Sequence, residues 1–197
     1  MISIVGFLSR SHGYAVLEEL VKNENITIQK IFTHSLNPLS QDSTRSVRDD
    51  FFLFENICTK NKIKLEIIDS KENQNIDILE CDYILEISWR YFIPKKVCLK
   101  AKKLAFGIHR GKLPDYAGSE PIKQALTKNE NNIILSVHDL LAEIDMGQVL
   151  NTMTYPVNYN SKKTFDENIQ RLRDEITPLF PKLTVQTLEK FETKQNL

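Results

Sequence analysis

The chain has 197 residues, of which 41% are hydrophobic, and its 26 basic side chains balance its 26 acidic ones. This size suffices for one full core, so we expect a single domain over 1–197 whose last part, 161–197, forms a helical tail. A chain with no net charge and no long basic run lacks the positive electrostatic potential that attracts a polyanion. No apolar stretch approaches the roughly 20 residues that span a bilayer. We therefore expect neither nucleic acid nor a membrane as a partner, and a cytoplasmic location.

In the first half of the chain, apolar runs alternate with helical patterns, which indicates strands joined by crossover helices. Three runs read as strands, at 2–8, 26–33 and 63–69. Between them, apolar residues recur at helical intervals over 14–21 and 47–61. Two such units predict a twisted, mostly parallel sheet with helices on both faces, which is an α/β fold.

The second half continues the alternation and then changes it. The remaining predicted elements are a strand, a short helix, a strand, a helix, two strands and a helical tail, at 83–89, 94–101, 103–109, 119–128, 132–140, 147–157 and 161–190. The last two strands flank a short turn. Pro178 and Pro181 are expected to interrupt the tail, because proline inside a helix removes a hydrogen bond and clashes with the preceding turn.

Motifs for three common kinds of site are missing. VGFLSRSHG has glycines only at Gly6 and Gly13, so the dinucleotide fingerprint G-x-G-x-x-G is absent. No G-x-S-x-G elbow supports serine hydrolysis. The histidines and cysteines show no short ligand spacing, so we expect no metal site and no disulfide framework. These residues are His12, His34, His109, His138, Cys58, Cys81 and Cys98.

Three polar signals follow strands of the predicted sheet, and ligands of an open α/β sheet bind at the carboxyl ends of its strands. The triplet Trp89-Arg90-Tyr91 follows one strand, His109 closes the next, and Asp145 lies in a later turn. A carboxylate beside an imidazole raises the imidazole pKa and orients the ring, as an acid/base pair requires. The alternative is that the histidine is structural and that the Asp-x-Gly sequence only makes a turn.

Two separated motifs in a fixed order carry a more specific signal. HRGKLPDYAGSEPIKQAL (109–126) followed by VHDLLAEIDMGQVL (137–150) resembles the folate-dependent formyltransferase family, and is most like its sugar N-formyltransferases. The resemblance covers residues 1 to about 157, and SWRYFIP (88–94) stands where that family has its pteridine loop. It implies a Rossmann-like formyltransferase fold.

The resemblance implies a reaction and its residues. A primary amine would attack the formyl carbon of 10-formyltetrahydrofolate, with His109 as the catalytic histidine and Asp145 as its supporting aspartate. Leu113, Pro114 and Gly118 would shape the intervening loop, and Gly147 would complete the turn after Asp145. The donor would be bound by Trp89, Arg90, Tyr91, Phe92, Leu141 and Ile144.

Five further residues are candidates for binding the amine substrate. Arg10 and His12 follow the first strand, where they can meet a phosphate or hydroxyl group. Arg110 and Lys112 flank the histidine and can bind a diphosphate or the glutamate tail of the folate, and Tyr116 lies in the same loop. The alternative for the charged side chains is a solvated turn.

One position departs from the family pattern. The family has an asparagine two residues before the histidine, whereas this chain has Gly107. An asparagine amide is a natural donor to an oxyanion, and loss of one such donor typically costs about 100- to 1,000-fold in rate. Another donor can substitute, water can take the space, or the protein keeps the pocket without the chemistry. A glycine required by the backbone at a strand end is a further reading.

The acceptor is narrowed by elimination within the family. The initiator-tRNA branch carries an added C-terminal domain, for which the roughly 40 residues after Val157 are too few. The glycinamide ribonucleotide branch has a Gly-Ser-rich loop where this chain has LSRSHG, and the formyl-folate hydrolases carry an added regulatory segment. We therefore expect an amino sugar linked to a nucleotide as the acceptor. A homodimer is left open, and a catalytically silent folate or nucleotide-sugar binding protein is the alternative.

Overall fold

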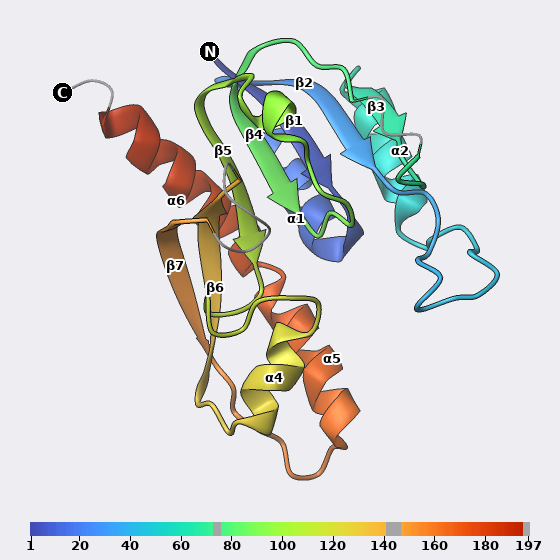
Figure 1. The fold of residues 1–197 in the computed structure, drawn as a ribbon, viewed down its shortest axis with the longest axis vertical. Helices are drawn as coiled ribbons and strands as arrows, with labels where there is room; N and C mark the ends of the chain where they lie inside the picture. Colours follow the sequence, from blue (N-terminus) through green and yellow to red (C-terminus); the bar gives the residue numbers. More distant parts are fainter. Residues whose placement is uncertain (73–75, 141–146, 195–197) are drawn as a thin grey trace. The chain divides into compact units, whose positions relative to one another are not determined.

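A computed structural model describes residues 1–72, 76–140 and 147–194 of the chain (Figure 1). The chain divides into two compact units, Met1–Ala105 and Phe106–Leu197. The strand order β3-β2-β1-β4-β5-β6-β7 makes a seven-stranded mixed sheet, which confirms the predicted α/β class with a mostly parallel sheet. The expectation of a single domain stays a prediction.

The first unit alternates strands and helices. Its elements are β1 (Ile2–Leu8), α1 (Arg10–Leu20), β2 (Ile26–Thr33), α2 (Phe51–Lys60), β3 (Lys64–Ile67), β4 (Cys81–Ile87), α3 (Lys95–Cys98) and the start of β5 (Ala101–His109). The pairs β1–β2, β2–β3 and β1–β4 are all parallel. The strand β1 has no polar side chain from Ile4 to Leu8, which agrees with its burial there: Ile4, Val5, Phe7 and Leu8 are fully inaccessible.

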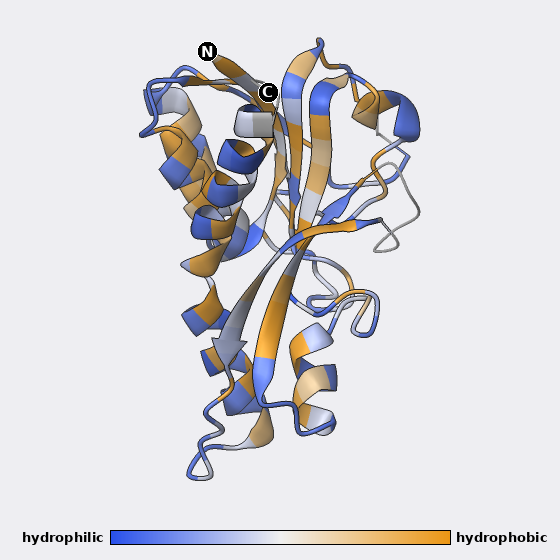
Figure 2. Cartoon of the chain, turned by 90° about the vertical axis from the view of Figure 1, so that its left-hand side faces the viewer, coloured by the Kyte–Doolittle hydropathy of each residue, from blue (hydrophilic) through white to orange (hydrophobic). Residues whose placement is uncertain are grey.

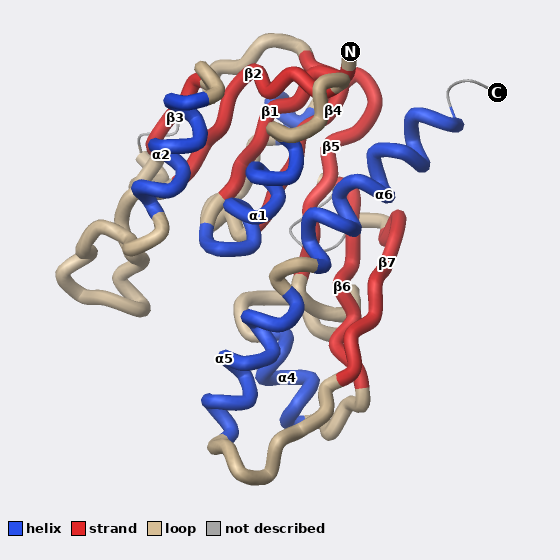
Figure 3. Tube along the Cα trace, turned by 180° about the vertical axis from the view of Figure 1, so that it is seen from behind, coloured by secondary structure: helices blue, strands red, loops and turns tan. Residues whose placement is uncertain are grey.

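The second unit is built differently. It contains the end of β5, then α4 (Pro121–Thr127), β6 (Asn132–Asp139), β7 (Val149–Pro156), α5 (Phe165–Ile176) and α6 (Leu179–Lys194). The pair β6–β7 is antiparallel, as expected for two strands that flank a short turn. The pair β5–β6 is also antiparallel, although a loop and α4 connect these two strands. α4 lies against α5 and β6, and α6 against β7 (Figure 3).

Several element boundaries differ from the predicted ones. The first helix begins at Arg10, and the second only at Phe51, because Val47 pairs with Leu36 in an isolated bridge and is 60% exposed. α3 is short because the next strand already starts at Ala101.

The tail breaks at one proline rather than two. Pro178 separates α5 from α6, whereas Pro181 lies in the first turn of α6, where the backbone N–H groups have no helical acceptor in any case. α5 starts with a capping box, in which Thr164 and Glu167 each accept the other's backbone N–H.

The distribution of apolar residues fits these elements. Several strands carry long hydrophobic stretches in Figure 2, while the helices carry both hydrophobic and hydrophilic bands, as expected for helices with one packed face. Among the described residues, no helix combines the length and the apolar character needed to cross a membrane.

Candidate active site

Parallel pairing brings four strand ends of the first unit to one edge of its sheet. The register aligns Leu8 with Ile87 and Thr33 with Ile67, so the segments that follow these residues start side by side. This is the edge at which open α/β sheets bind ligands. The segment 88–92, predicted to bind the donor, begins at this edge of the first unit. Arg10, predicted to bind the amine substrate, follows β1 at the same edge.

Trp89 is held between aromatic rings at this edge. Its ring stacks on the imidazole of His34, with centroids 4.0 Å apart and planes at 19°, and lies edge-on to Phe7 at 5.3 Å. Its backbone N–H donates to Oε1 of Glu86 at 2.7 Å. Ser88, just before it, has φ of 56°, a left-handed conformation that sharply redirects the chain out of β4.

The next residues of the segment bind to carbonyl groups that follow β2 and β3. Arg90 Nη2 donates to the carbonyl of Leu36 at 2.9 Å, and the Tyr91 hydroxyl donates to the carbonyl of Asp69 at 2.7 Å. Phe92 is 50% exposed. Trp89 Nε1 and Arg90 Nη1 are buried and have no acceptor among the described residues. Aromatic rings with spare N–H donors are suited to a pteridine, whose flat ring system carries several acceptors.

Two residues of the first unit were predicted to bind the amine substrate, and their surroundings differ. Arg10 opens α1 with φ of 62°, and its guanidinium donates to Asn37 Oδ1 at 3.3 Å and to Gln41 Oε1 at 2.5 Å. These bonds tie Arg10 to the loop after β2. His12 is only 3% exposed and belongs to the buried side of α1.

In the second unit, His109 is the last residue of β5. Its Nε2 lies 2.7 Å from the carbonyl oxygen of Tyr116, so Nε2 carries a proton and donates it to that carbonyl. In the neutral ring the lone pair is then on Nδ1. The bond to Tyr116 thus selects one tautomer of the half-buried neutral imidazole, whose basic nitrogen is Nδ1.

The loop after His109 is fixed by its own contacts. The Leu113–Pro114 peptide bond is cis, and the Leu113 N–H donates to Oγ of the buried Ser136 at 3.2 Å. Gly118 has φ of 96°, a conformation that residues with a side chain rarely adopt. These are the positions that the sequence motif marked as shaping the loop.

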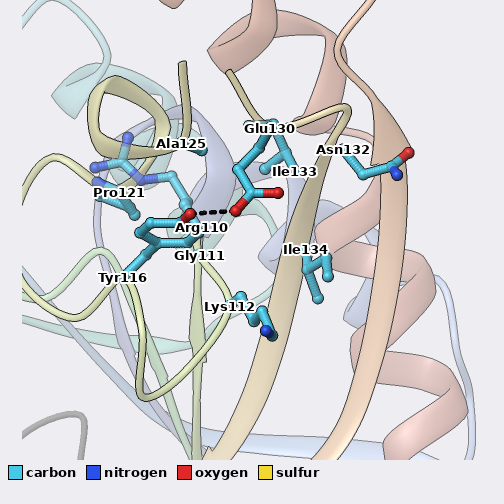
Figure 4. Close-up of a pocket in the computed structure, with 10 residues that line it drawn as sticks. All are labelled: Arg110, Gly111, Lys112, Tyr116, Pro121, Ala125, Glu130, Asn132, Ile133 and Ile134. Atoms are coloured by element: carbon cyan, nitrogen blue, oxygen red, sulfur yellow. Dashed lines mark hydrogen bonds between the residues drawn. The ribbon is translucent and has the colours of Figure 1, made fainter. Parts of the chain in front are cut away.

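Tyr116 is buried beside a cavity of about 20 Å³, which holds about one water molecule (Figure 4). Its hydroxyl donates to Oε1 of Glu130, and this bond raises the pKa of Tyr116 to about 12. Lys128 lies over its ring at 4.9 Å. Arg110 and Lys112 also line the cavity, and Lys112 forms a 2.7 Å ion pair with Asp115.

Gly107 has a specific neighbour across the sheet. In the antiparallel register Gly107 faces His138, and His109 faces Ser136. Residues directly opposite in such a pair share a face, so the imidazole of the buried His138 lies on the same face as that of His109. The pairing of β6 with β7 shifts between Val137 and His138, an irregularity that is frequent beside active sites.

Three predicted residues, Leu141, Ile144 and Asp145, lie outside the described residues. The glycine that follows them is constrained. A Cβ at Gly147 would clash with the backbone oxygen of Asp139, so only glycine fits this close approach.

Several contributors escaped the sequence analysis as site residues. His34, Ser136 and His138 each contact or face a predicted site residue. For His34 a signal existed, because it directly follows the strand 26–33 and so lies at the same edge as Trp89. Among the described residues, no group of three or more His, Cys, Asp or Glu residues is arranged to hold a metal ion.

Comparison with known proteins assigns a family to most of the chain. Residues 4–184 match the family model described as "Formyl transferase". The methionyl-tRNA formyltransferase of Lactobacillus delbrueckii is 27% identical over 112 residues, covering 57% of this chain and 34% of that protein. The methionyl-tRNA formyltransferase of Enterococcus faecalis is 23% identical over 193 residues, covering 96% of this chain and 58% of that protein. The chain thus spans roughly a third to three-fifths of the length of these relatives.

Solved structures show the same fold. Phosphoribosylglycinamide formyltransferase from Brucella melitensis superposes with a TM-score of 0.70 at 16% identity, covering 96% of this chain and 95% of that one. A formyltetrahydrofolate deformylase from Pseudomonas syringae gives a TM-score of 0.66 at 14% identity, covering 95% of this chain and 60% of that one. The names of these relatives and structures do not mention amino sugars, so the sugar branch stays a prediction.

Proposed function

Because the chain belongs to the formyl transferase family, we propose that it is an enzyme that moves a formyl group from 10-formyltetrahydrofolate to a primary amine. The observation that carries the proposal is His109 at the end of β5, with its tautomer set by the Tyr116 carbonyl. The donor would supply the formyl group, and residues of this chain would transfer the proton and bind both substrates.

His109 would handle the proton. When the amine nitrogen bonds to the formyl carbon, it becomes positively charged and must lose a proton, and Nδ1 of a neutral imidazole can accept that proton. The bond from the formyl carbon to the folate nitrogen then breaks, and the imidazolium returns the proton to that nitrogen. Asp145 would stabilise the imidazolium in this scheme.

The segment 88–92 would bind the pteridine. Support comes from the stacked ring of Trp89 and from the buried N–H groups of Trp89 and Arg90 that have no acceptor among the described residues. Leu141 and Ile144 are proposed to complete the donor site. Exclusion of water by such a pocket favours transfer to the amine over hydrolysis.

The acceptor is proposed to be an amino sugar linked to a nucleotide. Lys112, 54% exposed at its side chain, and Arg110 beside His109 offer cationic groups that suit a diphosphate, and Arg10 is a third candidate. Glycinamide ribonucleotide and methionyl-tRNA are the rival acceptors, since the relatives are named for them.

Two measurements test the proposal in order. Calorimetric titration with 5-formyltetrahydrofolate, a stable analogue of the donor, should give a micromolar Kd. Absence of heat at millimolar ligand would refute 10-formyltetrahydrofolate as the formyl donor. Formyl transfer should then be assayed with amino-sugar nucleotides, glycinamide ribonucleotide and methionyl-tRNA in parallel. Transfer to either rival alone would replace the proposed acceptor.

A second candidate function rests on Gly107. A strand-end glycine in place of the family asparagine removes one oxyanion donor, which suits a protein that binds folate or a nucleotide sugar without turnover. This candidate predicts donor binding with no transfer to any acceptor. Replacement of His109 by alanine separates the two, because it abolishes turnover in an enzyme and leaves the affinity of a binding protein unchanged.

A further inference from the structure

We infer that His34 is a positioning residue for the donor segment: its imidazole holds the backbone of Arg90 and the ring of Trp89, and so fixes the shape of residues 88–92. The inference deepens the proposed function, on which the binding role of that segment rests. His34 stands one residue beyond β2 and is 1% exposed.

Both nitrogens of the His34 ring are engaged, each with a different segment. Nδ1 lies 2.5 Å from the carbonyl oxygen of Ile68, and Nε2 lies 3.2 Å from the backbone nitrogen of Arg90. A carbonyl can only accept and a backbone N–H can only donate, so Nδ1 carries the proton and Nε2 the lone pair. The ring therefore links the segment after β3 to the segment after β4 in one tautomer only.

The faces and edges of the ring are engaged as well. The imidazole stacks on Trp89, and Tyr91 lies edge-on to it with centroids 5.1 Å apart and planes at 86°. His34 thus contacts three consecutive residues of the donor segment, two through their rings and one through its backbone. Leu36 and Asp69 anchor Arg90 and Tyr91 through backbone carbonyls, and the side chains of Glu86 and Phe7 contact Trp89.

The surroundings keep this ring neutral. Burial is the main cause that lowers the pKa of His34, to about 3, and the positive charges of Arg90 and Arg48 lower it further. The hydrogen bond to Ile68 and the charge of Asp69 act in the opposite direction. A protonated ring would lose the lone pair that Arg90 requires, so neutrality preserves the anchor.

The test uses two substitutions that separate the hydrogen bonds from the stacked ring. His34→Phe keeps a flat ring against Trp89 and removes both hydrogen bonds, whereas His34→Gln removes the ring and keeps an oxygen able to accept the Arg90 N–H. Thr33→Val is the matched control, because Thr33 is equally buried, precedes His34 directly, and has a hydroxyl with no hydrogen-bond partner among the described residues.

Three readouts report on the segment. Trp89 is the only tryptophan, so intrinsic fluorescence observes it directly. The exchange rate of the Arg90 amide proton measures the anchor, and titration with 5-formyltetrahydrofolate measures the donor site. In His34→Phe we expect amide exchange at least tenfold faster and about tenfold weaker donor binding, the factor for one buried donor left unsatisfied.

His34→Gln should shift Trp89 emission yet keep donor affinity within about threefold, and Thr33→Val should change none of the three readouts. A folded His34→Phe with wild-type Arg90 exchange and wild-type donor affinity would overturn the inference. Should His34→Phe not fold, nitrogen shifts of His34 in the wild type decide, since a proton on Nε2 contradicts the assigned tautomer.

The failure of this inference can be told apart from failure of the proposed function. If the wild type does not bind 5-formyltetrahydrofolate, the donor assignment is wrong, while Arg90 exchange and Trp89 emission still decide whether His34 fixes the segment.

Discussion

The guanidinium of Arg48 and the hydroxyl of Ser9 join the starts of two helices. Nη1 of Arg48 donates to Oγ of Ser9, the residue that precedes α1, and Nε donates at 2.9 Å to Asp50, the residue that precedes α2. The Arg48 side chain is 1% exposed, and this burial lowers its pKa. One buried cation thereby ties α1 to α2 at the edge where the candidate donor segment begins.

Replacement of Arg48 by methionine should therefore destabilise the first unit. Breaking a buried ion pair typically costs about 3–5 kcal/mol, and we expect the lower end because Asp50 is partly solvated. Urea unfolding followed by Trp89 fluorescence measures the change. Lys22→Met is the matched control, since its ion pair with Glu19 is exposed and should contribute less than about 1 kcal/mol. Equal losses in the two variants would contradict the role of Arg48.

His109 should affect turnover and not donor binding. In His109→Gln we expect kcat to fall by about 100- to 10,000-fold, the contribution of a positioned general base. The Kd for 5-formyltetrahydrofolate should stay within about threefold, because the predicted donor residues do not include His109. Single-turnover kinetics and calorimetry measure the two quantities. A tenfold loss of donor affinity with unchanged kcat would assign His109 to binding instead.

Gly107 offers a gain-of-function experiment. Asn at this position would return the side-chain amide that the family pattern has there, so Gly107→Asn should raise kcat by about 100-fold or more. Gly107→Ala adds a Cβ without a donor and is the control, with no gain expected. If Gly107→Asn brings no gain in a protein that turns over, another group already serves the oxyanion, and we would next replace His138, which faces Gly107 across the strand pair.

The stability of the protein should fall in acid because of His34. Its pKa is about 3 in the folded chain, whereas an unperturbed histidine has a pKa of 6.5, so between these values the unfolded chain binds more protons. Stability is therefore lost progressively as the pH drops from about 6.5 toward 3, by up to roughly 5 kcal/mol from this residue. Unfolding free energies at a series of pH values test this. In His34→Phe the unfolding free energy should fall less steeply as the pH drops through this range. An unchanged slope would assign the acid sensitivity to other groups.

Local patterns predicted most of the fold, because several strands are rich in apolar residues and the helices have apolar residues at regular intervals. The strands at 2–8 and 26–33 coincide with β1 and β2. The start of α2 was placed too early because Val47 pairs with Leu36, a contact that periodicity does not encode. The antiparallel pair β6–β7 agrees with the two strands predicted around a short turn, whereas the antiparallel pairing of β5 with β6, across a loop and α4, was not predicted.

Site residues were predictable where one short motif holds them. His109 and its loop lie within ten residues, and the bond from His109 to Tyr116 spans seven. His34 was missed as a site residue because its partners Ile68 and Arg90 are 34 and 56 residues away. Only the register of β2, β3 and β4 at a common edge brings them together.

Gly118 and Gly147 restrict substitution in their loops for different reasons. At Gly118 the restriction is conformational, since φ is 96° and no atom lies within 4 Å of a Cβ there, so asparagine is the replacement with most chance of acceptance. At Gly147 the restriction is space, because the Asp139 backbone blocks every side chain. A mutant library built to change acceptor preference should hold codon 147 fixed and can sample position 118 sparingly.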